Sequence, residues 1–137
     1  MRVSISFDEL RNLIAEHYKR DVMLSYINER EIHISTSVNA IFITKTVGIN
    51  VSLLELRDED VRISYSGGLG TGIIIKGIMM YLHRKVPAYN QMIEKLGANT
   101  LVVHIDKVKQ LEKVLEYLKL DNILFEKDSV VINTSFR

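Results

Sequence analysis

Residues 22–65 alternate apolar and polar side chains along most of their length. A period of two is typical of strands that bury one face of a sheet and leave the other wet. The strand-like segments come in a block before the central helical segments instead of alternating with them. This order predicts an α+β fold, with a largely antiparallel, curved sheet packed against helices on one face. We expect residues 1–137 to form a single domain.

The longest alternating run extends from Ala40 to Leu54 and has Gly48 near its middle. Two interpretations fit a glycine in that place. Either one long strand bends or bulges at Gly48, or two strands are joined there by a tight turn.

Helix signals lie on both sides of this block. Ser6-Phe7-Asp8-Glu9 fits a capping box and predicts a helix that ends near Lys19 or Arg20. A second helix is predicted from Pro87 to Leu96, with Gly97 as a left-handed cap. Asp106 is predicted to cap a third helix that carries Leu111, Leu115 and Leu118. Residues 123–125 and 130–132 are expected to form a closing hairpin.

Four of the seven glycines lie in one short loop, at Gly67, Gly68, Gly70 and Gly72. A loop of this kind can cradle a phosphate at a helix N-terminus. The dinucleotide-binding pattern fails because Ile73 occupies the place of its third glycine, and no Gly-Lys-Ser or Gly-Lys-Thr triplet exists. We therefore interpret the loop first as a structural turn or hinge, and only second as a phosphate site.

The segment that follows the loop predicts a helix that is apolar on nearly every side. Such a helix needs apolar neighbours on two sides. A fully intramolecular core is the commonest way to supply both, and the alternatives for the second side are a ligand, a second subunit or a membrane surface. Methionine adapts its shape to variable ligands. The candidate lining residues are Ile75, Ile78, Met79 and Leu82, with Arg84 and Lys85 placed to hold an anionic head group.

The four histidines show no metal-binding spacing. His33 and His104 could meet in space beside Glu31 or Asp106, and His104 with Asp106 could form a general-base pair. Ser66 lacks the setting of a nucleophile. We predict no catalytic residue, no metal and no cofactor, and the balance of these signals is against an enzyme.

Charge and cysteine content narrow the possible partners and covalent features of the protein. The chain has no cysteine and a net charge of +1, so disulfides are excluded and nucleic acid is not an expected partner. No secretory signal or apolar run of spanning length is visible, which makes the cytoplasm the expected location.

The order of long alternating strands, an apolar helix and a closing strand–helix–hairpin unit resembles that of lipid-handling α+β domains. The leading hypothesis is a non-enzymatic domain that holds a lipid-like or other hydrophobic molecule between the sheet and the apolar helix. The alternative is a structural or protein-interaction module that acts as a homo-oligomer. A phosphate- or nucleotide-binding enzyme that uses the glycine loop is third, and membrane-surface contact is the least favoured.

Overall fold

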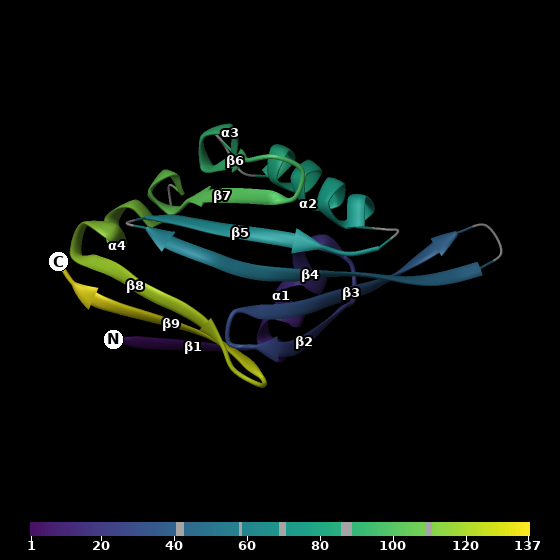
Figure 1. The fold of residues 1–137 in the computed structure, drawn as a ribbon, viewed down its shortest axis with the longest axis horizontal. Helices are drawn as coiled ribbons and strands as arrows, with labels where there is room; N and C mark the ends of the chain where they lie inside the picture. Colours follow the sequence, from purple (N-terminus) through teal and green to yellow (C-terminus); the bar gives the residue numbers. More distant parts are fainter. Residues whose placement is uncertain (41–42, 58, 69–70, 86–88, 109–110) are drawn as a thin grey trace.

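The computed structural model describes residues 1–40, 43–57, 59–68, 71–85, 89–108 and 111–137. Within them the chain has an α+β fold in which the strands pair antiparallel (Figure 1). Three strands form a sheet in the order β1-β9-β8, and six form a second sheet in the order β2-β3-β4-β5-β7-β6. The predicted fold class is therefore confirmed in its coarse form, α+β with antiparallel sheet.

The three-stranded sheet joins the two ends of the chain. Its strands are β1 (Arg2–Ser6), β8 (Leu118–Phe125) and β9 (Ser129–Phe136). The predicted closing hairpin is confirmed, although its strands are longer than expected. The sequence analysis missed β1, which is held by β9, more than 120 residues away along the chain.

The six-stranded sheet contains the alternating block. Its strands are β2 (Val22–Asn28), β3 (Glu31–Ala40), β4 (Ile43–Arg57), β5 (Asp60–Ser66), β6 (Ile93–Lys95) and β7 (Thr100–His104). The far part of the β3–β4 hairpin extends beyond β2 and β5 as a two-stranded arm (Figure 1).

Strand β4 is continuous through Gly48, which confirms that this run is one long strand and contradicts both a turn and a bulge at the glycine. Gly48 pairs in register with Ser35, and the register shift falls instead between Leu53 and Glu55. The close approach of a side chain explains the glycine, because a Cβ there would lie 2.6 Å from the His33 Nε2 atom.

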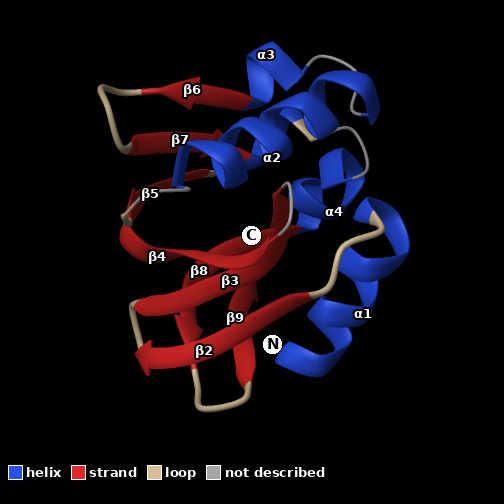
Figure 2. Cartoon of the chain, turned by 90° about the vertical axis from the view of Figure 1, so that its right-hand side faces the viewer, coloured by secondary structure: helices blue, strands red, loops and turns tan. Residues whose placement is uncertain are grey.

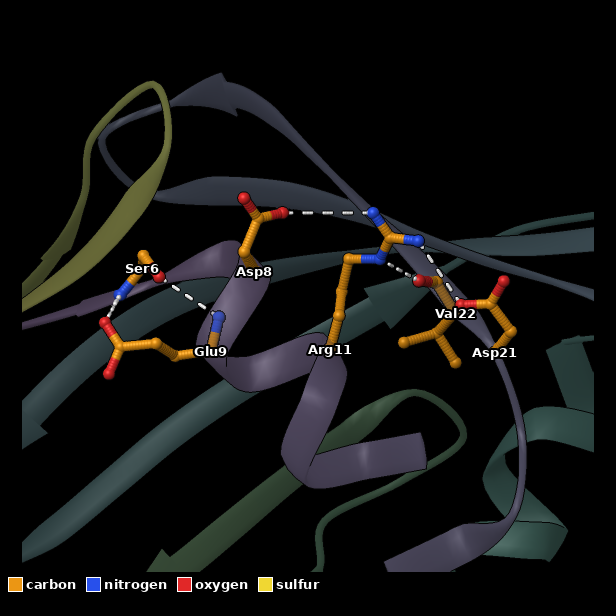
Figure 3. A network of polar contacts seen from close by, with 6 residues as sticks. All are labelled: Ser6, Asp8, Glu9, Arg11, Asp21 and Val22. Carbon is orange, nitrogen blue, oxygen red and sulfur yellow. Dashed lines mark hydrogen bonds and ion pairs between the residues drawn. The ribbon is translucent and has the colours of Figure 1, made fainter. Parts of the chain in front are cut away.

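Helix α1 (Phe7–Tyr18) begins and ends as predicted. The Ser6 hydroxyl accepts a hydrogen bond from the Glu9 N–H, and the Glu9 carboxylate accepts one from the Ser6 N–H (Figure 3). Lys19 closes the helix with φ of 59°. Arg11 then joins the helix to β2, because its Nε donates to the Val22 carbonyl at 2.7 Å (Figure 3).

The other helices are α2 (Thr71–Lys85), α3 (Tyr89–Met92) and α4 (Glu112–Tyr117), with a 3-10 turn η1 (Ile105–Lys107). Figure 2 shows α2 and α3 beside the β6–β7 end of the large sheet, and α1 near β2. Within the described residues, each helix is too short or too polar to cross a membrane.

Two predicted helices were wrong in extent. The helix expected up to Leu96 ends at Met92, because the next residues pair with β7 as β6, and Gly97, with the predicted positive φ (82°), lies in the β6–β7 turn. Asp106 caps no α-helix: it lies in η1, while α4 starts after Leu111. Leu118 belongs to β8 because it pairs with β9.

Within the described residues, two clusters of buried side chains share neighbours in β3 and β4. One gathers around Phe7, Ile32 and Phe125, and it packs α1 and the small sheet against the large sheet. The other gathers around Ile49, Tyr65 and Leu101, with Ile75 of α2 packed against it. Helix α2 therefore packs on the second cluster.

Candidate functional site

A groove of about 510 Å³ lies between α2, β5 and the β6–β7 hairpin. It is lined mostly by apolar side chains. The lining residues are Tyr65, Thr71, Gly72, Ile75, Lys76, Met79, Lys95, Ala98 and Leu101. Two of the predicted lining residues, Ile75 and Met79, are therefore brought together here from successive turns of α2.

The remaining predicted lining residues do not all reach this groove. Arg84 is exposed and is not among its lining residues. The side chains of Ile78, Leu82 and Lys85 lie outside the described part of the structure.

Two lysines supply the positive charge at this groove. Lys76 lies on α2 and Lys95 on β6, and both are exposed. Neither forms an ion pair with any other residue that the structure describes. Sequence reasoning missed Lys95 because its segment was expected to be helical. Only the pairing of β6 with β7 turns it toward α2.

The uncharged polar groups of the groove are already bonded within the protein. The Tyr65 hydroxyl donates to the Ala98 carbonyl at 3.0 Å, which leaves the ring as an apolar wall. The Thr71 hydroxyl donates to the Gly68 carbonyl at 3.0 Å. The lysines are therefore the charged groups that the lining offers to a ligand.

The glycine loop has a packing role at one position. A Cβ at Gly67 would lie 2.8 Å from the Gly48 carbonyl oxygen and 3.4 Å from the Ile49 Cα, so only glycine fits without movement. Gly68 and Gly72 have open space around the Cβ position, and Gly70 lies outside the described residues. The first N–H of α2, on Thr71, bonds to the Gly68 carbonyl.

A larger hollow of about 650 Å³ lies beside β2 and the β3–β4 arm. Its lining is polar and combines Lys19, Arg20 and Asp21 with hydroxyl side chains. Lys19 and Arg20 outnumber Asp21, whose carboxylate is already paired with Arg11, so the lining is weakly cationic. Met23 is its apolar lining residue, so this hollow lacks the apolar wall that the groove under α2 combines with its lysines.

A polar cluster surrounds His104 at the end of β7. Its Nδ1 lies 2.6 Å from Asp60 Oδ1, and its Nε2 lies 3.3 Å from Glu94 Oε2. Asp106 follows on the 3-10 turn and brings a third carboxylate close, so Asp60, His104 and Asp106 are the described residues able to share a metal ion. The hydrogen bond to Asp60 raises the pKa of His104, burial opposes this rise, and the bond to Glu94 adds to it.

The predicted meeting of His33 with His104 is wrong. His33 lies on β3, where its Nδ1 is 2.6 Å from the Asn50 side-chain oxygen, and β4 and β5 separate it from β7. Asp60 was missed as a partner of His104 because the two residues are 44 positions apart. Only the β5–β7 register places them opposite each other.

Comparison of the chain with protein-family models, with curated proteins and with solved structures found no match.

Proposed function

We propose that the groove under α2 binds an apolar molecule with an anionic end, such as a fatty-acid-like amphiphile. The observation that carries the proposal is a mostly apolar groove with two lysines that form no ion pair with another described residue. Its volume of about 510 Å³ falls within the range of about 300–1,000 Å³ that is usual for small-molecule sites. A non-enzymatic carrier or sensor in the cytoplasm, built on a curved sheet with helices on one face, is the setting that we propose for it.

The apolar and the charged residues of the lining indicate how such a ligand would lie. Its chain would contact Ile75, Met79 and Leu101, where burial of apolar surface contributes about 25 cal/mol per Å². Its anionic end would lie between Lys76 and Lys95, which approach from α2 and β6. These lysines replace Arg84 and Lys85 as the residues proposed to hold the head group.

The first experiment combines native mass spectrometry of the purified protein with organic extraction of the same sample. An apolar adduct on the monomer, in stoichiometric amount, supports the proposal and identifies the ligand class. Calorimetric titration with dodecanoate and with uncharged dodecanol then separates the contribution of the head group from that of the chain.

Charge reversal tests the lysines. The double variant Lys76→Glu/Lys95→Glu should weaken dodecanoate binding at least tenfold, because a hydrogen bond to a charged group contributes about 1.5–3 kcal/mol. Dodecanol binding should be unchanged. Arg84→Glu, on the same helix and outside the groove, is the control.

Neighbouring methionines test the apolar wall. Met79→Gln should weaken both probes, whereas Met80→Gln, at a residue that is 46% exposed and outside the lining, should weaken neither. Absence of dodecanoate binding to the wild-type protein, or equal effects of the two substitutions, contradicts the proposal.

Exposed aromatic residues favour the second candidate, a homo-oligomeric interaction module. Tyr117 and Phe136 are 69% and 80% exposed, and they lie at one end of the β8–β9 pair. Contact with a second chain would remove these two aromatic side chains from water. A clean dimer without an adduct in the same mass spectra would favour this function over ligand binding.

A further inference from the structure

Three metal-ligating side chains converge where β5 begins and β7 ends. One ligand atom each from Asp60, His104 and Asp106 lies within 4.8 Å of the others. They come from a strand start, a strand end and the 3-10 turn η1, so three elements meet at this point. The groove under α2 contains none of these residues, and the cluster therefore stands apart from the proposed ligand site.

Backbone pairing places these residues and is independent of any metal. Asp60 and His104 are opposite each other in the antiparallel β5–β7 register, which puts their side chains on one face. The Ile105 N–H donates to the Glu59 carbonyl at 2.8 Å, and this bond ties η1 to the start of β5. Asp106 is consequently held next to the pair.

Glu94 orients the imidazole for coordination. Its carboxylate lies 3.3 Å from His104 Nε2, and Nδ1 is the ring nitrogen that lies beside Asp60. A metal-bound histidine commonly donates its other N–H to a carboxylate, which fixes the ring and the tautomer. Glu94 occupies that outer position here.

We propose that His104 Nδ1, Asp60 and Asp106 bind one divalent transition-metal ion, with Zn²⁺ as the type case, and that Glu94 accepts the Nε2–H bond. A mixed imidazole and carboxylate set suits Zn²⁺, Co²⁺ or Mn²⁺, whereas Ca²⁺ and Mg²⁺ prefer oxygen ligands throughout. Three protein ligands leave a fourth tetrahedral position to water.

The adjustment needed to admit the ion is small. Ligand atoms about 2.1 Å from Zn²⁺ lie roughly 3.4 Å apart on a tetrahedron. The Nδ1 to Oδ1 distance, now 2.6 Å, would lengthen, and the separations of up to 4.8 Å would shorten. The side chains of Asp60 and Asp106 are 49% and 45% exposed, so they can rotate and water can reach the site.

Charge at the cluster favours a cation. Three carboxylates surround one imidazole, and the nearby amine is Lys107, whose Nζ lies 4.0 Å from Asp106 Oδ2. A divalent ion would neutralise this excess and compete with the ammonium group for Asp106. Removal of the Lys107 charge should therefore tighten metal binding.

Asp106→Asn is the most informative variant, because it removes a ligand and leaves the bonds of His104 to Asp60 and Glu94 in place. The purified full chain is stripped with a chelator and titrated with Zn²⁺ by calorimetry and with Co²⁺ by visible absorption. We expect one Zn²⁺ per chain, a Co²⁺ spectrum of low coordination number, and at least a tenfold loss of affinity in Asp106→Asn.

Two further variants complete the test. Lys107→Gln should raise the affinity, and His83→Asn, at an exposed histidine on α2, should leave it unchanged. The proposal is overturned if Zn²⁺ fails to bind stoichiometrically, or if Asp106→Asn binds it as tightly as the wild-type chain. It is also overturned if His83→Asn abolishes binding.

Discussion

Helices α1 and α2 are positioned by different means. Helix α1 carries its own start and stop signals, namely the Ser6–Glu9 capping box and the left-handed Lys19, and Arg11 binds the backbone of β2. Helix α2 has no acidic residue in its first turn and rests on the Ile49–Tyr65–Leu101 cluster through Ile75. Local residues set both ends of α1, whereas contact with the sheet sets the position of α2.

The difference explains why the groove lies under α2. Polar bonds with fixed directions hold α1 against β2, and its apolar side faces the cluster around Phe7. Apolar contact holds α2, and such contact has no fixed direction, which is why we propose that a ligand replaces part of it. Three substitutions test this contrast, and a pH dependence tests the His104 cluster outside both helices, in order from the largest expected effect to the smallest.

Ile49→Ala should remove the support of α2 and lower the free energy of unfolding by about 2–5 kcal/mol. Ile49 is 1% exposed at the centre of its cluster. Ile43→Ala, on the same strand but 63% exposed, is the control and should change stability by no more than about 0.5 kcal/mol. Chemical denaturation measures both, and equal losses would contradict the assigned core.

Gly67→Ala should cost about 1–3 kcal/mol, because the new methyl group meets the backbone of Gly48 and Ile49, which cannot move aside. The matched control is Gly68→Ala, where no atom lies within 4 Å of the added Cβ. Thermal unfolding compares the two variants. If both lose the same stability, chain flexibility and not close packing is what the loop requires.

Ser6→Ala should cost about 1 kcal/mol, since the Glu9 N–H loses its capping acceptor. Ser6→Asp restores an acceptor at that position and should recover most of the loss. Denaturant titration with circular dichroism detection measures this, and an Asp variant as unstable as the Ala variant would argue against the cap.

The smallest effect is a pH dependence at His104. Its pKa is raised in the folded protein, chiefly by the Asp60 hydrogen bond, above the unfolded value of about 6.5. The stabilisation is therefore complete below about pH 6.5 and is lost as pH rises through the folded pKa. Groups that face the ring are Asp60, Glu94 and Asp106, with Lys107 beyond.

The midpoint of thermal unfolding, measured in chelator between pH 6 and 9, tests that dependence. The advantage of the wild-type protein over Asp60→Asn should shrink as pH rises. An advantage that stays constant across this range would show that the protonated His104–Asp60 pair does not contribute to stability.

Local signals predicted some elements accurately and failed for others. The α1 cap, strands β2, β5 and β7, helix α2 and the β8–β9 hairpin were all anticipated from spacing and turn residues. The failures were β1, β6 and the capping role of Asp106, at segments whose structure depends on partners elsewhere in the chain. In such short segments the apolar periodicity is too brief to predict the secondary structure, which contacts with distant partners decide.

At the two candidate sites, too, local sequence predicted some residues, and pairing with distant segments brought in the others. The apolar character of α2 was evident from sequence, and Ile75 and Met79 do line the groove. Lys95 and Asp60 were not found, because β-sheet pairing brings each to its site from a distant segment.

By itself, the sequence determined the capped start of α1 and the apolar helix after the glycine loop, because each follows from residues within a few positions of one another. It also determined the α+β class, because the order of strand and helix patterns along the chain is independent of how they pair. The tertiary structure alone decided that β1 joins β9, that Lys95 faces α2 and that Asp60 meets His104. The physical reason is that strand pairing is satisfied by hydrogen bonds between segments of any separation. No local sequence pattern specifies which strand a given strand will pair with.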